Sequence, residues 1–306
     1  MVSISCKHFY IRLSGAFRYN TCMPDFFAPV KAVDKFQQRH RLPGFMVGVI
    51  KKYGDDQGGY QAALLTYYGF LALFPLLLVL TTLVQMFLQG DSQLRQTIIH
   101  GATNYIPIIG SQLQQNVHNV GGHGVALVLG LLTLIYGLRG VADAFRNTVN
   151  HAWEVPREKR SGFLPATARS FGIIAGGGIG FLAAAIISAY ATAAGHHYGL
   201  RVILFVISAA VLFVSLLFII KLALNRPVKM RQLWPGAAVA TVGLLIIQAI
   251  GGFLITHQLK RLNNLYGTFA VVLGLLFLLY LEAQILVYSL EIDAVRGLKR
   301  WPRHLF

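Results

Sequence analysis

Six long apolar stretches alternate with five loops between Ala62 and Leu290, and this alternation constrains the fold of the chain more than any other feature. A bilayer core ~30 Å thick needs ~20 helical residues per crossing, at a rise of ~1.5 Å per residue. The stretches span residues 62–88, 120–142, 171–194, 202–224, 235–257 and 266–290, although the strongly apolar part of the second runs only from Gly124 to Leu138. The pattern predicts an all-α, polytopic membrane protein with six transmembrane helices.

Lys and Arg residues lie on alternate sides of these stretches. Of the 27, 23 fall before the first span, in the loops after the second and fourth spans or the last four residues of those spans (Arg139 and Lys221), and after the last span. Because cytoplasmic loops carry the excess of positive charge, these segments are expected in the cytoplasm. Both termini are therefore predicted to be cytoplasmic, in agreement with an even number of spans.

The net charge of +16 comes from these same Lys and Arg residues beside the spans. A nucleic-acid-binding protein gathers its cations on one soluble face, whereas here they flank membrane exits. At such positions each cation favours the anionic cytoplasmic leaflet by about 1 kcal/mol. We therefore expect membrane lipids, and no nucleic acid, as partners.

The segments outside the spans are short. Residues 1–44 are predicted to form a partly disordered cytoplasmic arm, without a cleavable signal peptide and with Cys6 and Cys22 reduced. Residues 45–61 are predicted to form an interfacial amphipathic helix, since apolar residues recur at helical spacing beside Lys51 and Lys52. Residues 291–306 are predicted to form a basic cytoplasmic tail.

A second amphipathic segment continues out of the second span. Asp143 lies four residues from Arg139 and three from Arg146, so on a helix it can pair with either arginine. Asn150 lies on the same polar side. Two interpretations stay open: helix packing, or a polar lining at the cytoplasmic mouth of a cavity.

Small residues recur every four positions in the third span, at Gly172, Gly176, Gly180 and Ala184. Because they lie inside an apolar stretch and not after a strand, they do not indicate nucleotide binding. They predict a seam that another helix approaches closely. The partner helix can belong to this chain or to a second subunit, so a homo-oligomer through the Gly172 face is one option.

Several motifs occur in an order that resembles the YihY/BrkB family of bacterial inner-membrane proteins, over residues 51–296. They are Ala62-Ala63-Leu64-Leu65-Thr66-Tyr67-Tyr68, Phe74-Pro75-Leu76-Leu77, Tyr136-Gly137, the region of Arg146-Asn147 with Asn150 and Trp153, Trp234-Pro235-Gly236, Leu265-Tyr266-Gly267, and Glu291 followed by Asp293. The resemblance implies a six-helix protein of the bacterial inner membrane without a defined biochemical activity. Glu282 departs from it, since family members more often carry a small or neutral residue there.

The family has also carried a ribonuclease label, which the residues do not favour. A metal-dependent nuclease needs clustered His and Asp ligands to activate water. His196 and His197 form the one adjacent pair, and neighbouring residues on a helix point ~100° apart. We therefore predict that the protein is not an enzyme and holds neither a metal nor a cofactor.

Polar residues within the spans are the best indicators of function. Glu282 is expected on the order of 12 Å deep in the last span, where a carboxylate must pair, face water or be protonated. We hypothesise that it borders a substrate or proton path together with Tyr67, Tyr68, Arg139, Asp143, Arg146 and Asn150. The alternative is a single carboxylate capped by a neighbouring helix.

Pro75 lies in the middle of the first span and is expected to kink it. Bent helices line cavities in transporters, and they also occur in passive bundles. The sequence thus favours a transporter or flippase of a lipid-like or anionic envelope component. The alternative is a membrane scaffold or envelope-assembly factor that transports nothing.

Overall fold

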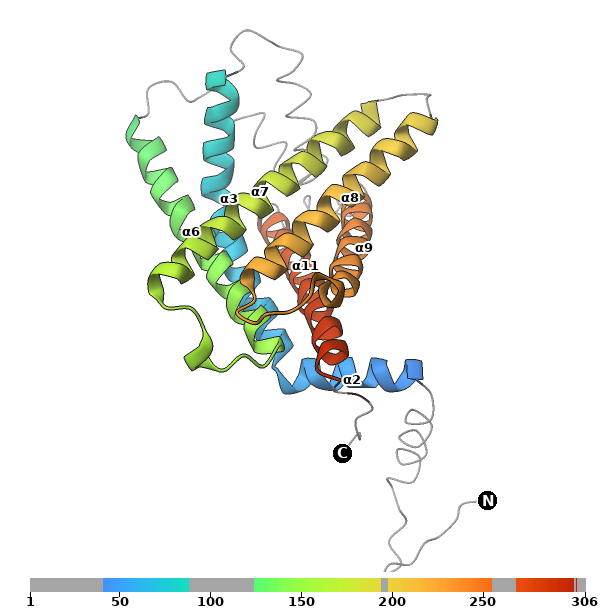
Figure 1. Ribbon diagram of the computed structural model, residues 1–306. Helices are drawn as coiled ribbons and strands as arrows, with labels where there is room; N and C mark the ends of the chain where they lie inside the picture. The colour runs from blue at the N-terminus through green and yellow to red at the C-terminus, as the bar shows by residue number, and fades with distance from the viewer. Residues whose placement is uncertain (1–40, 88–123, 194–197, 255–267, 300, 302–306) are drawn as a thin grey trace, which may run out of the picture.

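The computed structural model describes residues 41–87, 124–193, 198–254, 268–299 and 301. Residues 1–40 of the predicted N-terminal arm, with its cysteines, and His196-His197 lie outside these ranges, whereas residues 41–44 of that arm are helical. The described chain is helical and contains no strand, which confirms the all-α class for this part of the protein. Its helices (Figure 1) are α2 (Arg41–Asp55), α3 (Gly58–Phe87), α6 (Gly124–Ala152), the short 3-10 helix η1 (Arg157–Lys159), α7 (Phe163–Ala193), α8 (Tyr198–Ala223), α9 (Met230–Leu254) and α11 (Thr268–Gly297).

Four described segments are long and apolar enough to cross a membrane. They are Phe163–Ser188, Tyr198–Ala223, Met230–Ile250 and Val272–Gly297, and they match the third to sixth predicted spans. The first two predicted spans fall on α3 and α6, which are helical but are not among these four. The count of six spans therefore stays a prediction.

Several boundaries differ from those expected. The interfacial helix ends at Asp55, where Gln57 turns the chain with a φ of 53°, so residues 58–61 already belong to α3. Helix α7 begins at Phe163, well before residue 171, and α11 runs to Gly297, so Glu291 and Asp293 are helical and not part of a tail. An apolar run ends at its first charged residue, whereas a helix continues wherever polar side chains find partners.

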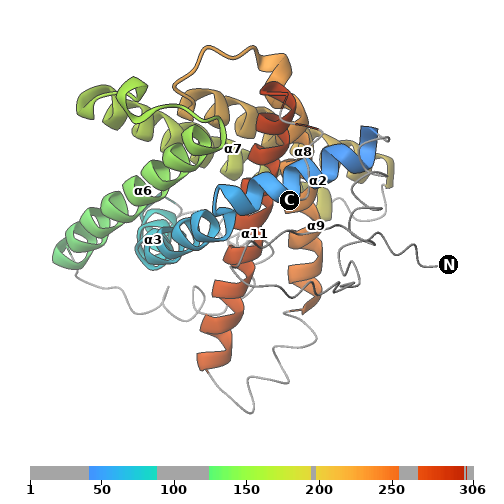
Figure 2. The same ribbon diagram turned by 90° about the horizontal axis from the view of Figure 1, so that it is seen from below.

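The helices form antiparallel pairs, and these pairs meet at one end of the bundle. Helix α7 packs along α8, α3 along α6, and α9 along α11, while α11 also contacts α2 and α3. Helix α2 lies across one end of the bundle (Figures 1 and 2). We call this end the base. It also contains the α6–α7 and α8–α9 connections and the end of α11.

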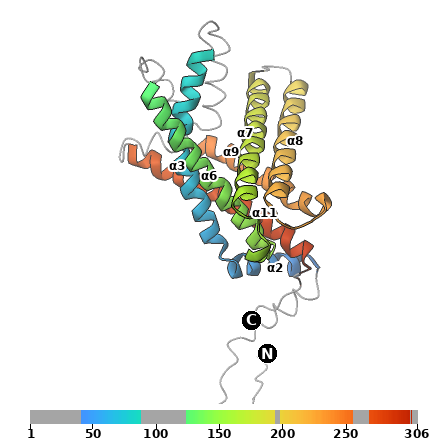
Figure 3. The same cartoon turned by 60° about the vertical axis from the view of Figure 1, so that its left-hand side comes forward.

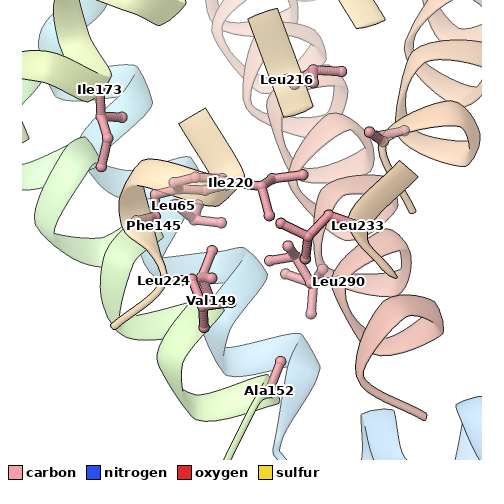
Figure 4. Packing of buried hydrophobic residues seen from close by; sticks show 14 of the residues in the cluster. Leu65, Phe145, Val149, Ala152, Ile173, Leu216, Ile220, Leu224, Leu233 and Leu290 are labelled. Carbon is pink, nitrogen blue, oxygen red and sulfur yellow. The ribbon is translucent and has the colours of Figure 1, made fainter. Parts of the chain in front are cut away.

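The apolar core is concentrated towards the base. Phe145 and Val149 of α6 meet Leu65 of α3, and Ile220, Leu233 and Leu290 come from α8, α9 and α11 (Figure 4). Away from the base, the α3–α6 pair and the α7–α8 pair diverge (Figure 3). Consistent with this, Tyr136 of α6 is 67% exposed and Phe171 of α7 is half exposed. The helices are thus held together mainly at one end.

Candidate functional site

Helix α8 of the same chain packs against the small-residue seam of α7. A Cβ atom added to Gly172 would lie 2.7 Å from Leu222, and one added to Gly176 would lie 2.8 Å from Phe218. Ser208 Oγ donates a hydrogen bond to the Ala184 carbonyl at 2.9 Å, and a Cβ on Gly180 would overlap the side chain of Ser215. This face is occupied within the chain, so a homo-oligomer, which stays a prediction, would have to use another face.

The charged residues at the end of α6 join it to the start of α7. Arg146 Nη1 donates hydrogen bonds to Asp143 Oδ1, the Ala166 carbonyl and Ser170 Oγ, each at 2.9 Å. Ser170 Oγ also donates to Asp143 Oδ1 at 2.7 Å. Arg139 Nε lies 3.7 Å from Asp143 Oδ2. Asp143 therefore pairs with both arginines, where the spacing alone left the choice open.

We call Arg139, Asp143, Arg146, Arg169 and Ser170 the arginine cluster. Burial lowers the pKa of Arg146, Asp143 opposes this shift, and the nearby positive charge of Arg169 adds to it. The cluster contains three guanidinium groups and one carboxylate, so it carries an excess of positive charge. Such an excess at the edge of a membrane bundle attracts anions.

Asn150 is fully buried and fastens α6 to the end of α8. Its Nδ2 donates to the Ala223 carbonyl at 2.9 Å and to the Arg146 carbonyl at 2.7 Å, and its Oδ1 accepts from the Asn225 backbone N–H at 2.9 Å. Asn225 Oδ1 in turn accepts a hydrogen bond from Arg169. The polar atoms of Asn150 are therefore used in holding helices together, which leaves none to line a path.

The two tyrosines of α3 have different surroundings. Their rings contact each other edge to face, with centroids 5.2 Å apart. Tyr68 packs against α6 so closely that a Cβ on Gly140 would overlap its ring, whereas Tyr67 is mostly exposed. Pro75 lies further along the same helix, which continues to Phe87, so the kink stays a prediction.

Glu282 stands apart from these residues. It lies eleven residues before Asp293 on α11, which places both on nearly the same side of the helix. Asp293 contacts α9, so this side faces α9. Within the described ranges no hydrogen bond or ion pair involves Glu282, so the structure links it neither to the tyrosines nor to the arginine cluster.

A buried lysine at the base was not predicted from the sequence. Lys52 of α2 is only 1% exposed. Its Nζ is hydrogen-bonded to Asp56 and lies 3.5 Å from Glu291 Oε2 of α11 and 3.8 Å from Glu154 Oε1. We call these four residues the lysine junction. Lys52 follows Val49 by three residues and so shares its buried face, a spacing that could have indicated burial.

A second contact that was not predicted joins α9 to α11. Pro235 lies inside α9 and has no N–H. The N–H of the next residue, Gly236, donates to Asp293 Oδ1 at 2.7 Å. A Cβ at this position would overlap the Asp293 carboxylate and the Ser289 carbonyl. Glu291 and Asp293, two residues apart on a helix, thus point to different elements and hold α11 to both α2 and α9.

The sequence of this chain matches the family described as Virulence factor BrkB over residues 49–304. The chain belongs to the BrkB family. Together with the four helices able to span a membrane, this membership makes it an integral membrane protein. It also confirms the resemblance drawn from the sequence.

Two curated relatives of this BrkB protein are similar over most of its length. The ribonuclease-like protein YfkH of Bacillus subtilis is 23% identical over 270 residues, which cover 82% of this chain and 94% of the relative. A UPF0761 membrane protein of Chromohalobacter salexigens is 25% identical over 264 residues, which cover 82% of this chain and 63% of the relative. No solved structure gives a significant match.

The ribonuclease-like name of one BrkB relative raises the question of metal ligands. In the described portion of the chain, no group of three or more His, Cys, Asp or Glu residues could hold a metal ion. The predicted absence of enzymatic activity stays a prediction.

Replacing Asn150 with alanine is expected to destabilise this BrkB protein by about 1–3 kcal/mol, because the buried Ala223 carbonyl and Asn225 N–H lose their partner. Thermal unfolding in detergent measures the loss. Asn147→Ala is the matched control, since Asn147 is exposed one turn earlier. Equal melting temperatures for the two variants would contradict the role given to Asn150.

Proposed function

We propose that this BrkB protein is a transporter or flippase that moves a lipid-like or anionic component of the cell envelope. The arginine cluster carries the proposal. It places excess positive charge where α6 meets the first turns of α7, in a bundle whose helices expose many large apolar side chains. A molecule with an anionic group and an apolar body fits such a surface.

The distribution of charge supports an orientation with the base in the cytoplasm. Among the described Lys and Arg residues, Arg201 at the start of α8 lies at the far end of the bundle and Arg139 lies near the middle of α6, while the others lie in the base or in the helix turns next to it. The positive-inside rule then places the start of α2 and the end of α11 in the cytoplasm. The corresponding location is the bacterial inner membrane.

Glu282 is proposed as a separate, proton-carrying element. It lies in the candidate span Val272–Gly297 and has no partner among the described residues. Ionisable residues in such positions commonly serve transport. The proposed path therefore has two parts: the arginine cluster binds the anionic group, and Glu282 couples movement to protons. No catalytic group and no cofactor is proposed.

A scaffold or assembly factor that transports nothing is the second candidate. One observation favours it: the four candidate spans bury between 17% and 39% of their most apolar segments within the chain. The remaining apolar surface is available to lipid or to helices of partner proteins. A scaffold would use that surface for assembly.

Flux of fluorescent lipids and small anions into proteoliposomes tests the proposal. Wild type should show flux that increases with an imposed proton gradient, and Glu282→Gln should lose this dependence because an amide cannot carry a proton. Glu158→Gln is the matched control, since Glu158 is an exposed carboxylate of η1, outside the candidate spans. A wild type without flux across a broad panel would overturn transport and favour the scaffold.

A further inference from the structure

We propose that the exposed face of α6 beside the arginine cluster binds the phosphate group of an anionic phospholipid, with Arg139 as the main contact. The inference deepens and rests on the proposed function, because it names the chemical class of the anionic group. It also concerns binding alone, so it can be tested without measuring transport.

The face of α6 changes character along its length. Residues Leu132, Tyr136, Arg139, Asp143 and Asn147 follow one another at steps of three or four, which places them on one side of the helix. Leu132 and Tyr136 are mostly exposed, and Arg139 is 39% exposed. From the far end towards the base, the face is therefore apolar, then aromatic, then charged. A phospholipid presents its acyl chains, interfacial region and headgroup in this order.

Arg139 has hydrogen-bonding capacity left for a ligand. Asp143 Oδ1 is engaged by Arg146 and Ser170, whereas Arg139 Nε lies 3.7 Å from Oδ2 and its Nη2 makes one long hydrogen bond of 3.3 Å to Thr167. A guanidinium carries five N–H donors in a planar fork. This fork matches two phosphate oxygens at once.

The depth of the arginine cluster also fits a phospholipid headgroup. The candidate span of α7 begins at Phe163, and Arg139 contacts the first residues of that span, Phe163 and Thr167. The guanidinium of Arg139 lies over the Phe163 ring, with its Cζ 5.2 Å from the centroid. Phe163 and Leu164 are both more than 70% exposed. Charge and exposed apolar side chains therefore meet at the start of a span, where a phospholipid headgroup lies.

A free phosphate ion would share the contact with Arg139 but would make no use of the exposed apolar and aromatic residues around it. A phospholipid uses both. The experiment therefore compares the two sources of phosphate directly and also separates anionic from zwitterionic headgroups.

The full chain, purified in a neutral detergent, is titrated with dioleoyl phosphatidylglycerol, dioleoyl phosphatidylcholine or inorganic phosphate, and binding is measured by native mass spectrometry. Wild type should bind phosphatidylglycerol at least about tenfold more tightly than phosphatidylcholine. Arg139→Gln should lose this preference, and Arg139→Lys should keep part of it, because a single ammonium replaces the fork. Arg231→Gln, which removes an exposed charge at the base end of α9, should keep all of it.

Three results would overturn the inference. The first is an equal loss of preference in Arg231→Gln, which would mean general attraction to the basic end. The second is a wild type without any preference. The third is inorganic phosphate binding as tightly as the phospholipid with the same dependence on Arg139. A wild type that shows the Arg139-dependent preference yet moves neither lipids nor small anions in proteoliposomes would overturn the proposed function and leave this site standing.

Discussion

Lys52→Met is expected to destabilise the protein by about 3–5 kcal/mol, because it breaks a buried ion pair by removing one partner. The ammonium of Lys52 is almost fully buried and is the cation that faces Glu291, itself 2% exposed. Methionine keeps the length of the side chain but leaves that buried carboxylate without its counter-charge. Thermal unfolding in detergent, followed by the loss of monodisperse protein, measures the change.

Two further variants separate the charge pair from a general effect of losing a lysine. Lys229→Met removes an exposed cation from the α8–α9 connection and should leave the melting temperature nearly unchanged. Adding Glu291→Gln to Lys52→Met should recover part of the lost stability, since the unpaired carboxylate is then gone. Additive losses in the double variant would refute the pairing of Lys52 with Glu291.

Gly236→Val is expected to cost at least about 2 kcal/mol, because overpacking and the loss of a hydrogen bond act together. The new side chain would overlap the Asp293 carboxylate and the Ser289 carbonyl, so α9 and α11 would have to move apart. Such a movement would break the bond from the Gly236 N–H to Asp293. The melting temperature and the yield of folded protein report the effect.

Gly178→Ala is the matched control for a glycine within a transmembrane helix. A Cβ at Gly178 meets no atom within 4 Å, so alanine fits there without displacing a neighbour. This variant should be as stable as wild type or slightly more so, because alanine favours the helix over glycine. If both substitutions lowered the melting temperature equally, close approach at Gly236 would not explain its effect.

Features that depend on neighbouring residues could be predicted from the sequence. The apolar runs of the third to sixth spans became α7, α8, α9 and α11, because burial in a bilayer requires each segment to satisfy its own backbone. The pairing of Asp143 with the arginines followed from helical spacing. The seam at Gly172 was also recognisable as a packing surface, although its partner helix was not.

Features that depend on residues far apart in the sequence could not be predicted. Asn150 fits the polar side of an amphipathic helix, and only the arrival of the end of α8 explains its burial. Lys52 is one of two adjacent lysines, and its burial depends on a carboxylate near the end of α11. The predicted path also assumed that Glu282 lies near the arginine cluster, whereas α11 turns that side towards α9.

The contacts that fasten the base have a consequence for biosynthesis. Lys52 and Gly236 emerge from the ribosome before their partners Glu291 and Asp293, which lie in the last described helix. Until α11 has been inserted, Lys52 can pair with Asp56 and Glu154 but not with Glu291, and the Gly236 N–H lacks its acceptor on Asp293. Closure of the base thus depends on the last described helix, and a chain that stops before Glu291 is expected to lack the contacts that hold α11 to α2 and α9.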